Sequence, residues 1–292
     1  MVRFHWHVED GLGASVGPGQ LVYLRDYGVL QAMVEIEMPG GGTLEACMTI
    51  PQNYNTDSGV KELGVVLAAP GCEAGDWRGR LLSEVAVGLA RSGFLVVRAI
   101  FPPAARSDPA RAALLDRVCD AAATSPYARG VTRWLLAGLG GGARVAALAG
   151  PRLRSGVAGY ALLSYPLMEP MQLEDPQQQQ QPGSPTSTPP AAAAAPDSSG
   201  PLLGLTAPLL FVTAATDPWV SEAALVELGP RLASPDVRSV VVPDVDSHFR
   251  TPTGKGPLAP TVRAVLAALL ELLHPAAAYR MDVCKLPRIW RA

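Results

Sequence analysis

Cysteines and charged residues are scarce in this sequence. The 292 residues include four cysteines, and Lys, Arg, Asp and Glu together make up 17% of the chain. No CxxC pair occurs, so we expect neither a disulfide framework nor a cysteine-rich metal site, and scattered thiols are typical of a reducing compartment. The formal net charge of −2 offers no basic footprint for nucleic acid.

Long apolar runs are also missing. No stretch reaches about 18 apolar residues without a charge or a helix breaker, so we expect no membrane span. The first ten residues lack an apolar core and already contain Glu9 and Asp10, so we expect no signal or transit peptide. These absences predict an intracellular protein in the cytoplasm, with the nucleus left open.

Hydrophobic residues make up 48% of the chain and recur in alternating strand and helix patterns. Strands are expected at 32–38, 44–50, 63–69, 94–100, 133–137, 157–164, 208–213 and 237–242, and helices at 81–91, 109–123, 142–149, 222–232 and 260–274. The fold class is therefore α/β. A mostly parallel, eight-stranded sheet with helices on both faces is the order expected of an α/β-hydrolase core.

Composition divides the chain into one domain with extensions. Residues 1–19 read as a loosely attached N-terminal arm, residues 20–274 as a single domain, and residues 275–292 as a basic C-terminal tail. Residues 169–203 contain five successive glutamines, many prolines and five successive alanines, a composition typical of a disordered insertion. We expect protein partners, contacted through the arm or the tail, and the alternative is a tail folded back on its own domain.

A glycine-rich turn follows the strand expected at 133–137. Hydrolases of this architecture place their nucleophile in a G-x-S-x-G turn between a strand and a helix. Here Gly138 and Gly142 occupy the two flanking positions, and Gly140 stands where the serine belongs. The sequence thus predicts the elbow of a serine hydrolase with its nucleophile position vacant.

The other catalytic positions look filled. Asp217 follows the strand at 208–213, where the acid belongs, and His248 follows the strand at 237–242, where the base belongs. Asp244 and Asp246 are alternative partners of His248. The alternative explanation of Asp217 is an ordinary Asp–Pro turn without a catalytic role.

The turn after the strand at 63–69 is the expected oxyanion loop. It carries Gly71 and Cys72, whose backbone N–H groups, together with that of Gly141, can point at a developing oxyanion. Cys72 is also a candidate substitute nucleophile, although a small half-buried residue is the simpler explanation.

Five motifs in order resemble the dienelactone-hydrolase-like branch of the α/β-hydrolases, in particular the group with a testis-expressed protein and the third subunit of the non-specific lethal chromatin complex. The carrying residues are Ala69-Pro70-Gly71, Gly138 to Arg144, Ser164-Tyr165-Pro166-Leu167, Phe211 to Asp217, and Ser247-His248. The resemblance spans residues 32–274 and implies ester or lactone hydrolysis without a cofactor. The chain departs from the pattern at Gly140, at Pro70 where relatives have histidine, and at the insertion.

The missing nucleophile at position 140 favours one of three functional hypotheses. Removing a triad serine costs on the order of 10⁶-fold in turnover, so we expect a pseudoenzyme that serves as a scaffold or partner-binding subunit. One alternative is a divergent hydrolase that uses Cys72 or a water activated by His248 and Asp217. Another is a small-molecule sensor that uses the vestigial site.

Overall fold

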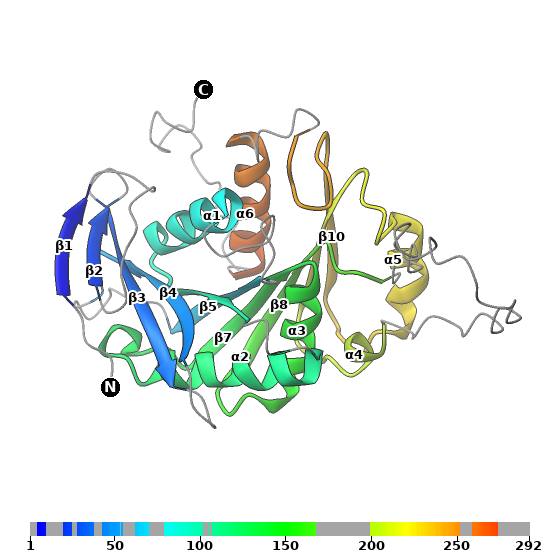
Figure 1. The fold of residues 1–292 in the computed structure, drawn as a ribbon. Helices are drawn as coiled ribbons and strands as arrows, with labels where there is room; N and C mark the ends of the chain where they lie inside the picture. The colour runs from blue at the N-terminus through cyan, green and yellow to red at the C-terminus, as the bar shows by residue number, and fades with distance from the viewer. Residues whose placement is uncertain are drawn as a thin grey trace, which may run out of the picture.

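A computed structural model gives the fold of the chain. It describes residues 5–9, 20–24, 28–37, 43–52, 54, 62–69, 79–101, 105, 107–167, 199–251 and 259–273. One ten-stranded sheet runs through it in the order β1-β2-β3-β4-β6-β5-β7-β8-β9-β10. Helices cover both faces of this sheet (Figure 1).

The elements agree closely with the periodicity of the sequence. The strands are β1 His5–Glu9, β2 Gln20–Leu24, β3 Val29–Glu37, β4 Thr43–Pro51, β5 Leu63–Ala69, β6 Val96–Ile100, β7 Arg133–Leu139, β8 Gly156–Leu163, β9 Leu209–Ala214 and β10 Val237–Val242. The α-helices are α1 Arg80–Arg91, α2 Asp108–Ala123, α3 Gly141–Ala149, α4 Gly200–Leu203, α5 Glu222–Leu228 and α6 Ala259–Leu273. No described helix has the length and apolar character needed to cross a bilayer.

The six strands from β5 to β10 are mutually parallel, whereas β3 and β4 pair antiparallel with their neighbours. Strands β3 to β10 are the eight that the sequence predicts, so the predicted fold class is confirmed. Because parallel strands end at the same edge of a sheet, the segments that follow β7, β9 and β10 all start at one edge.

Two apolar layers hold the sheet between its helices. Val66 and Ala68 of β5 pack with α2 and α3 on one face, while Val65 and Leu67 pack with α1 and α6 on the other. Successive residues of a strand point to opposite faces. The uninterrupted apolar run of β5 is therefore buried on both sides, as a central parallel strand requires.

Two elements lie in segments for which the sequence predicted no regular structure. Within the predicted loose arm, His5–Glu9 forms β1, which pairs in parallel with β2 at the outer edge of the sheet. At the end of the predicted insertion, Gly200–Leu203 forms helix α4, with Leu202 fully buried. The remainder of the insertion, residues 169–198, and the tail at 275–292 lie outside the described residues.

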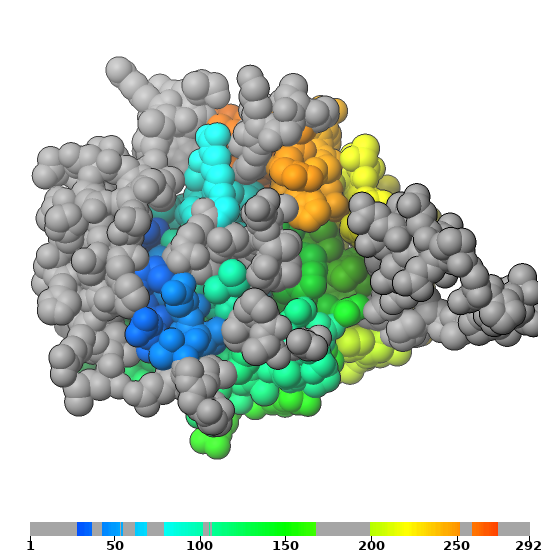
Figure 2. Space-filling model, viewed as in Figure 1, coloured from blue at the N-terminus to red at the C-terminus, as the bar shows by residue number. Residues whose placement is uncertain are grey.

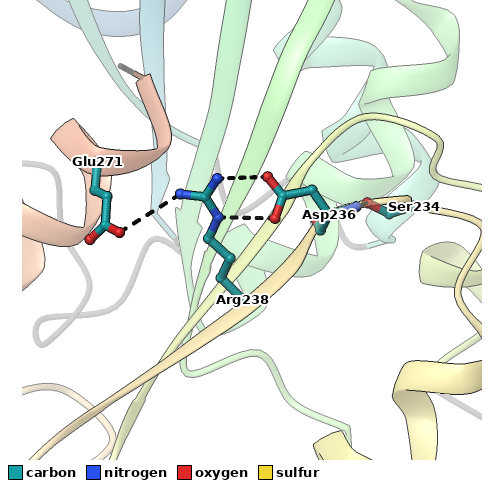
Figure 3. Close-up of polar contacts among 4 residues, drawn as sticks. All are labelled: Ser234, Asp236, Arg238 and Glu271. Atoms are coloured by element: carbon teal, nitrogen blue, oxygen red, sulfur yellow. Dashed lines mark hydrogen bonds and ion pairs between the residues drawn. The ribbon is translucent and has the colours of Figure 1, made fainter. Parts of the chain in front are cut away.

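The last strand is tied to the last helix by charged side chains. Arg238 of β10 makes two hydrogen bonds to Asp236, at 2.9 and 2.8 Å, and its guanidinium lies 4.0 Å from Glu271 of α6 (Figure 3). Ser234 accepts a 3.3 Å hydrogen bond from the backbone N–H of Asp236. This end of β10 is thereby fixed. Beyond the other end of β10, the following segment reaches the surface, in orange in Figure 2.

Candidate functional site

The turn between β7 and α3 has the shape of a nucleophile elbow. Gly140 adopts φ 56° and ψ −121°, a conformation that favours glycine. Its N–H donates to the carbonyl of Leu163 on β8 at 2.8 Å, and its carbonyl accepts from the N–H of Ala143 at 3.0 Å. The chain thus passes from strand to helix at one residue, which is the position predicted for the missing serine.

Close backbone contact requires glycine at position 138. A β-carbon on Gly138 would lie 2.3 Å from the carbonyl carbon and oxygen of Gly142 and 2.5 Å from the N–H nitrogen of Ala143. Since backbone atoms cannot move aside cheaply, only glycine lets β7 and α3 approach this closely. The close approach of the Gly142 backbone therefore requires glycine at position 138.

The space at Gly140 itself is open. No heavy atom lies within 4 Å of the position that a β-carbon would take, and the residue is half-buried. Gly141 begins α3, whose N-terminus has no side-chain cap, and such a helix end presents N–H groups with partial positive charge. The other two predicted oxyanion residues, Gly71 and Cys72, lie outside the described residues.

Asp217 follows β9 at the same edge of the sheet. Its Oδ1 accepts a 3.0 Å hydrogen bond from the N–H of Trp219, which closes a tight turn. Its Oδ2 is buried and has no hydrogen-bond partner among the described residues. Oδ1 is thus hydrogen-bonded within its own loop, and Oδ2 is free to accept a hydrogen bond.

His248 lies on a loop that Asp246 closes. The Asp246 carboxylate accepts hydrogen bonds from the N–H of His248 at 2.9 Å and from the N–H and Nε of Arg250, both at 2.8 Å. Burial opposes ionisation of Asp246, but these hydrogen bonds from Arg250 and His248 outweigh it and hold its pKa below the usual value. The buried ring of Phe249, at φ 59°, anchors the loop to the core.

The predicted acid and base lie on joined loops but do not bond to each other in the described structure. The hydroxyl of Thr216, next to Asp217, donates to the carbonyl of Val245 at 2.9 Å. Asp246, a competitor for the imidazole, binds the backbone of His248 instead. The nearest hydroxyl to Nδ1 of His248 is that of Ser247 at 3.5 Å, beyond the roughly 2.7–3.2 Å of a well-formed hydrogen bond.

Ser164 is a residue beside the elbow whose geometry the sequence does not reveal. It follows β8 directly after Leu163, the residue that accepts the Gly140 N–H, and it adopts φ 46°. It is 1% exposed, and its hydroxyl has no hydrogen-bond partner in the described part of the chain. Its place at a strand end is readable from the pattern, whereas its left-handed backbone is not.

Other nucleophiles and metal ligands are not assembled in the described regions. Of the cysteines there, Cys47 and Cys119 are both buried, and burial raises the pKa of the Cys119 thiol. No group of three potential metal-ligating side chains occurs among the residues whose positions are described. The chemistry of the described site is therefore that of Asp217, His248 and the bare elbow.

Comparison with known proteins reveals matches in structure only. No protein-family model matches the sequence, and no curated protein matches it. An α/β serine hydrolase without a lid from Xanthomonas campestris superposes with a TM-score of 0.57 at 16% identity, over 90% of this chain and 97% of that one. Est1E from Butyrivibrio proteoclasticus gives 0.59 at 18% identity, over 82% and 98%. A dienelactone hydrolase from Anabaena variabilis gives 0.58 at 16% identity, over 84% and 98%.

This protein has the α/β-hydrolase fold. The matches cover nearly the whole length of each neighbour, so the core of the fold is complete in this chain. In hydrolases of this fold, the nucleophile elbow lies between a strand and a helix, and the acid and the base follow later strands. The placement of Gly140, Asp217 and His248 follows that order along the chain.

Proposed function

We propose that this protein is a non-catalytic α/β-hydrolase-like protein that serves as a scaffold or partner-binding subunit. The observation that carries the proposal is Gly140, which stands at the elbow in the backbone conformation of a nucleophile but has no side chain. Without an attacking oxygen or sulfur, an acyl intermediate cannot form at this position. Retained fold and lost nucleophile together favour a role in binding.

The state of the acid and base supports the same proposal. An Asp–His pair works by holding the imidazole in one tautomer through a hydrogen bond. Among the described residues, Oδ2 of Asp217 has no partner, and Nδ1 of His248 faces Ser247 at a long distance. Selection for turnover would maintain the Asp–His bond, and a binding protein does not require it.

A divergent hydrolase is the second candidate function. The retained acid and base favour it, with Cys72 or a water held by His248 and Asp217 as the nucleophile. Iodoacetamide labelling near neutral pH separates these versions, because an activated thiolate at Cys72 would react quickly. An unreactive Cys72 removes the thiolate version and leaves only the water.

A sensor that binds a small molecule without turnover differs from a scaffold in its response to ligands. A thermal-shift screen with esters, lactones and carboxylic acids distinguishes the two, because a ligand that binds the folded state raises its melting temperature. A flat response supports the scaffold.

Hydrolysis of short-chain p-nitrophenyl esters tests the main proposal. We expect the purified protein to remain at the background rate, with no change in a His248→Ala variant. Turnover well above background that the His248→Ala substitution abolishes would refute the proposal. The matched control is Ser239→Ala, a change at an exposed residue of β10 outside the proposed machinery.

A further inference from the structure

Exposed arginines gather at the edge of the sheet opposite the elbow. Five of them lie on α2, before β7, at the start of β7 and before β8, and we call them the arginine edge: Arg117, Arg129, Arg133, Arg152 and Arg154. All five are exposed. Because β7 and β8 are parallel, their first residues lie at the edge away from Gly140, so this surface is separate from the catalytic positions (Figure 1).

Register and electrostatics place these arginines together. Arg133 pairs with Gly156 at the start of β8, and a β-carbon on Gly156 would lie 3.3 Å from Cγ of Arg133. The Arg133 side chain therefore lies over the strand that Arg154 precedes. On α2, burial and then Asp120 raise the pKa of Asp116, while Arg154, Arg117 and Arg152 lower it by less. Asp116 thus links the α2 side of the edge to the turn before β8.

None of the five guanidinium groups takes part in an ion pair or a hydrogen bond within the described part of the chain. Several other arginines are engaged: Arg80 pairs with Glu84, Arg144 with Asp108, and Arg250 with Asp246. Asp116 and Asp120 on α2 lie close to the arginine edge, and the backbone carbonyl of Glu62 accepts from the N–H of Arg133. No described carboxylate forms an ion pair with the five guanidinium groups, so their donors are unused within the described part of the chain.

We infer that the arginine edge binds an acidic segment of a protein partner. A guanidinium presents a planar fork that matches a carboxylate, and exposed arginines without internal partners supply it without first breaking an ion pair. The interleaved carboxylates and the net charge of −2 disfavour a nucleic acid or an anionic membrane, both of which require a denser positive field. This inference rests on the proposed partner-binding role and names its surface and the chemistry of its partner.

Fluorescence anisotropy with a labelled poly-glutamate peptide tests the inference on the full chain at about 0.15 M salt. The test variant is the double reversal Arg133→Glu with Arg154→Glu. The matched control is Arg91→Glu with Arg263→Glu, which changes the net charge equally on α1 and α6 and likewise breaks no described ion pair. Circular dichroism checks that all variants fold.

We expect the edge reversal to weaken peptide binding about tenfold and the control to weaken it less than about twofold, because exposed charges act over short distances in salt. Asp116→Asn removes a carboxylate from the edge and should tighten binding. Absence of peptide binding to the native protein, or equal losses in both double variants, would overturn the inference. So would tighter binding of duplex DNA or phosphatidylserine vesicles than of the peptide through the same arginines.

The peptide-binding test and the esterase test can fail independently of each other. If the protein hydrolyses esters but still binds the peptide through the edge, the non-catalytic role fails and the surface remains. If it neither hydrolyses esters nor binds the peptide, the surface fails and the non-catalytic role remains.

Discussion

Gly138 and Gly142 meet backbone to backbone where β7 turns into α3. The contact leaves 2.3 Å between the Gly142 carbonyl and a β-carbon added to Gly138, far below the separation that real β-carbons tolerate. Two residues away, the β-carbon position of Gly140 has no heavy atom within 4 Å. The turn is therefore tightly constrained at its flanks and unobstructed at its tip, the geometry in which a nucleophile is normally presented.

Gly138→Ala should destabilise the fold by roughly 2–3 kcal/mol, because overpacking against backbone forces the strand and the helix apart. The free energy of unfolding from denaturant titration measures the effect. Gly229→Ala is the matched control, since no heavy atom lies within 4 Å of its added β-carbon, and it should change stability by less than about 0.5 kcal/mol. Equal effects at the two positions would contradict the close contact.

Gly140→Ser should fold and cost roughly 1–3 kcal/mol, which is the penalty of a side chain at this positive φ. Its esterase rate should stay at least about 10³-fold below that of an ordinary serine hydrolase, because the described Asp217 and His248 are not hydrogen-bonded. Kinetics with p-nitrophenyl acetate measure this. A fully active variant would show that the acid and base are already correctly paired in the native protein.

Asp116→Asn should stabilise the protein at neutral pH, on the order of 0.5 kcal/mol. Burial raises the pKa of Asp116 above 3.8, so the folded state binds this proton more tightly than the unfolded state and loses stability as pH rises through that interval. Below pH 3.8 the carboxyl is protonated in both states, and the gain should vanish. Thermal melts at pH 7 and near pH 3 measure the difference, with Glu227→Gln, a change at an exposed carboxyl of α5, as the control.

Asp246 should respond to pH with the opposite sign. Its pKa is lowered below 3.8 when folded, so its stabilising contribution is complete above that value and is lost as pH falls through the folded pKa. Asp246→Asn should therefore lower the free energy of unfolding at pH 7 and show a smaller loss in acid than the native protein. If the variant and the native protein lose stability in parallel, the hydrogen bonds to Arg250 and His248 do not set this pKa.

Most of the core could be predicted from the sequence because burial on both faces leaves a plain apolar pattern. β5 and β10 match their predicted ranges residue for residue, and the glycine-rich turn predicted after residue 137 joins a strand to a helix. The two outer strands were missed because a short edge segment such as Gln20–Leu24 carries little periodicity. Helix α4 was missed because it is short, contains Pro201 and follows a segment of biased composition. Its one buried residue, Leu202, gives no helical periodicity.

The site was less predictable than the fold. Chain order predicts Asp217 and His248 as the acid and the base, because these groups follow particular strands in hydrolases. Hydrogen bonding between side chains depends on loop geometry that no periodicity encodes. The role of Asp246 as a clamp for its own loop, and the left-handed backbone of Ser164, emerge only from the three-dimensional arrangement.

Covalent trapping with a fluorophosphonate probe tests the absence of an activated serine nucleophile most directly. Such probes react with activated serines, and intact-mass spectrometry detects the adduct without any assumption about the substrate. We expect no adduct on the native protein after treatment that fully labels a serine hydrolase control. A stoichiometric adduct that maps to Ser247 or Ser164 and disappears in His248→Ala would contradict it.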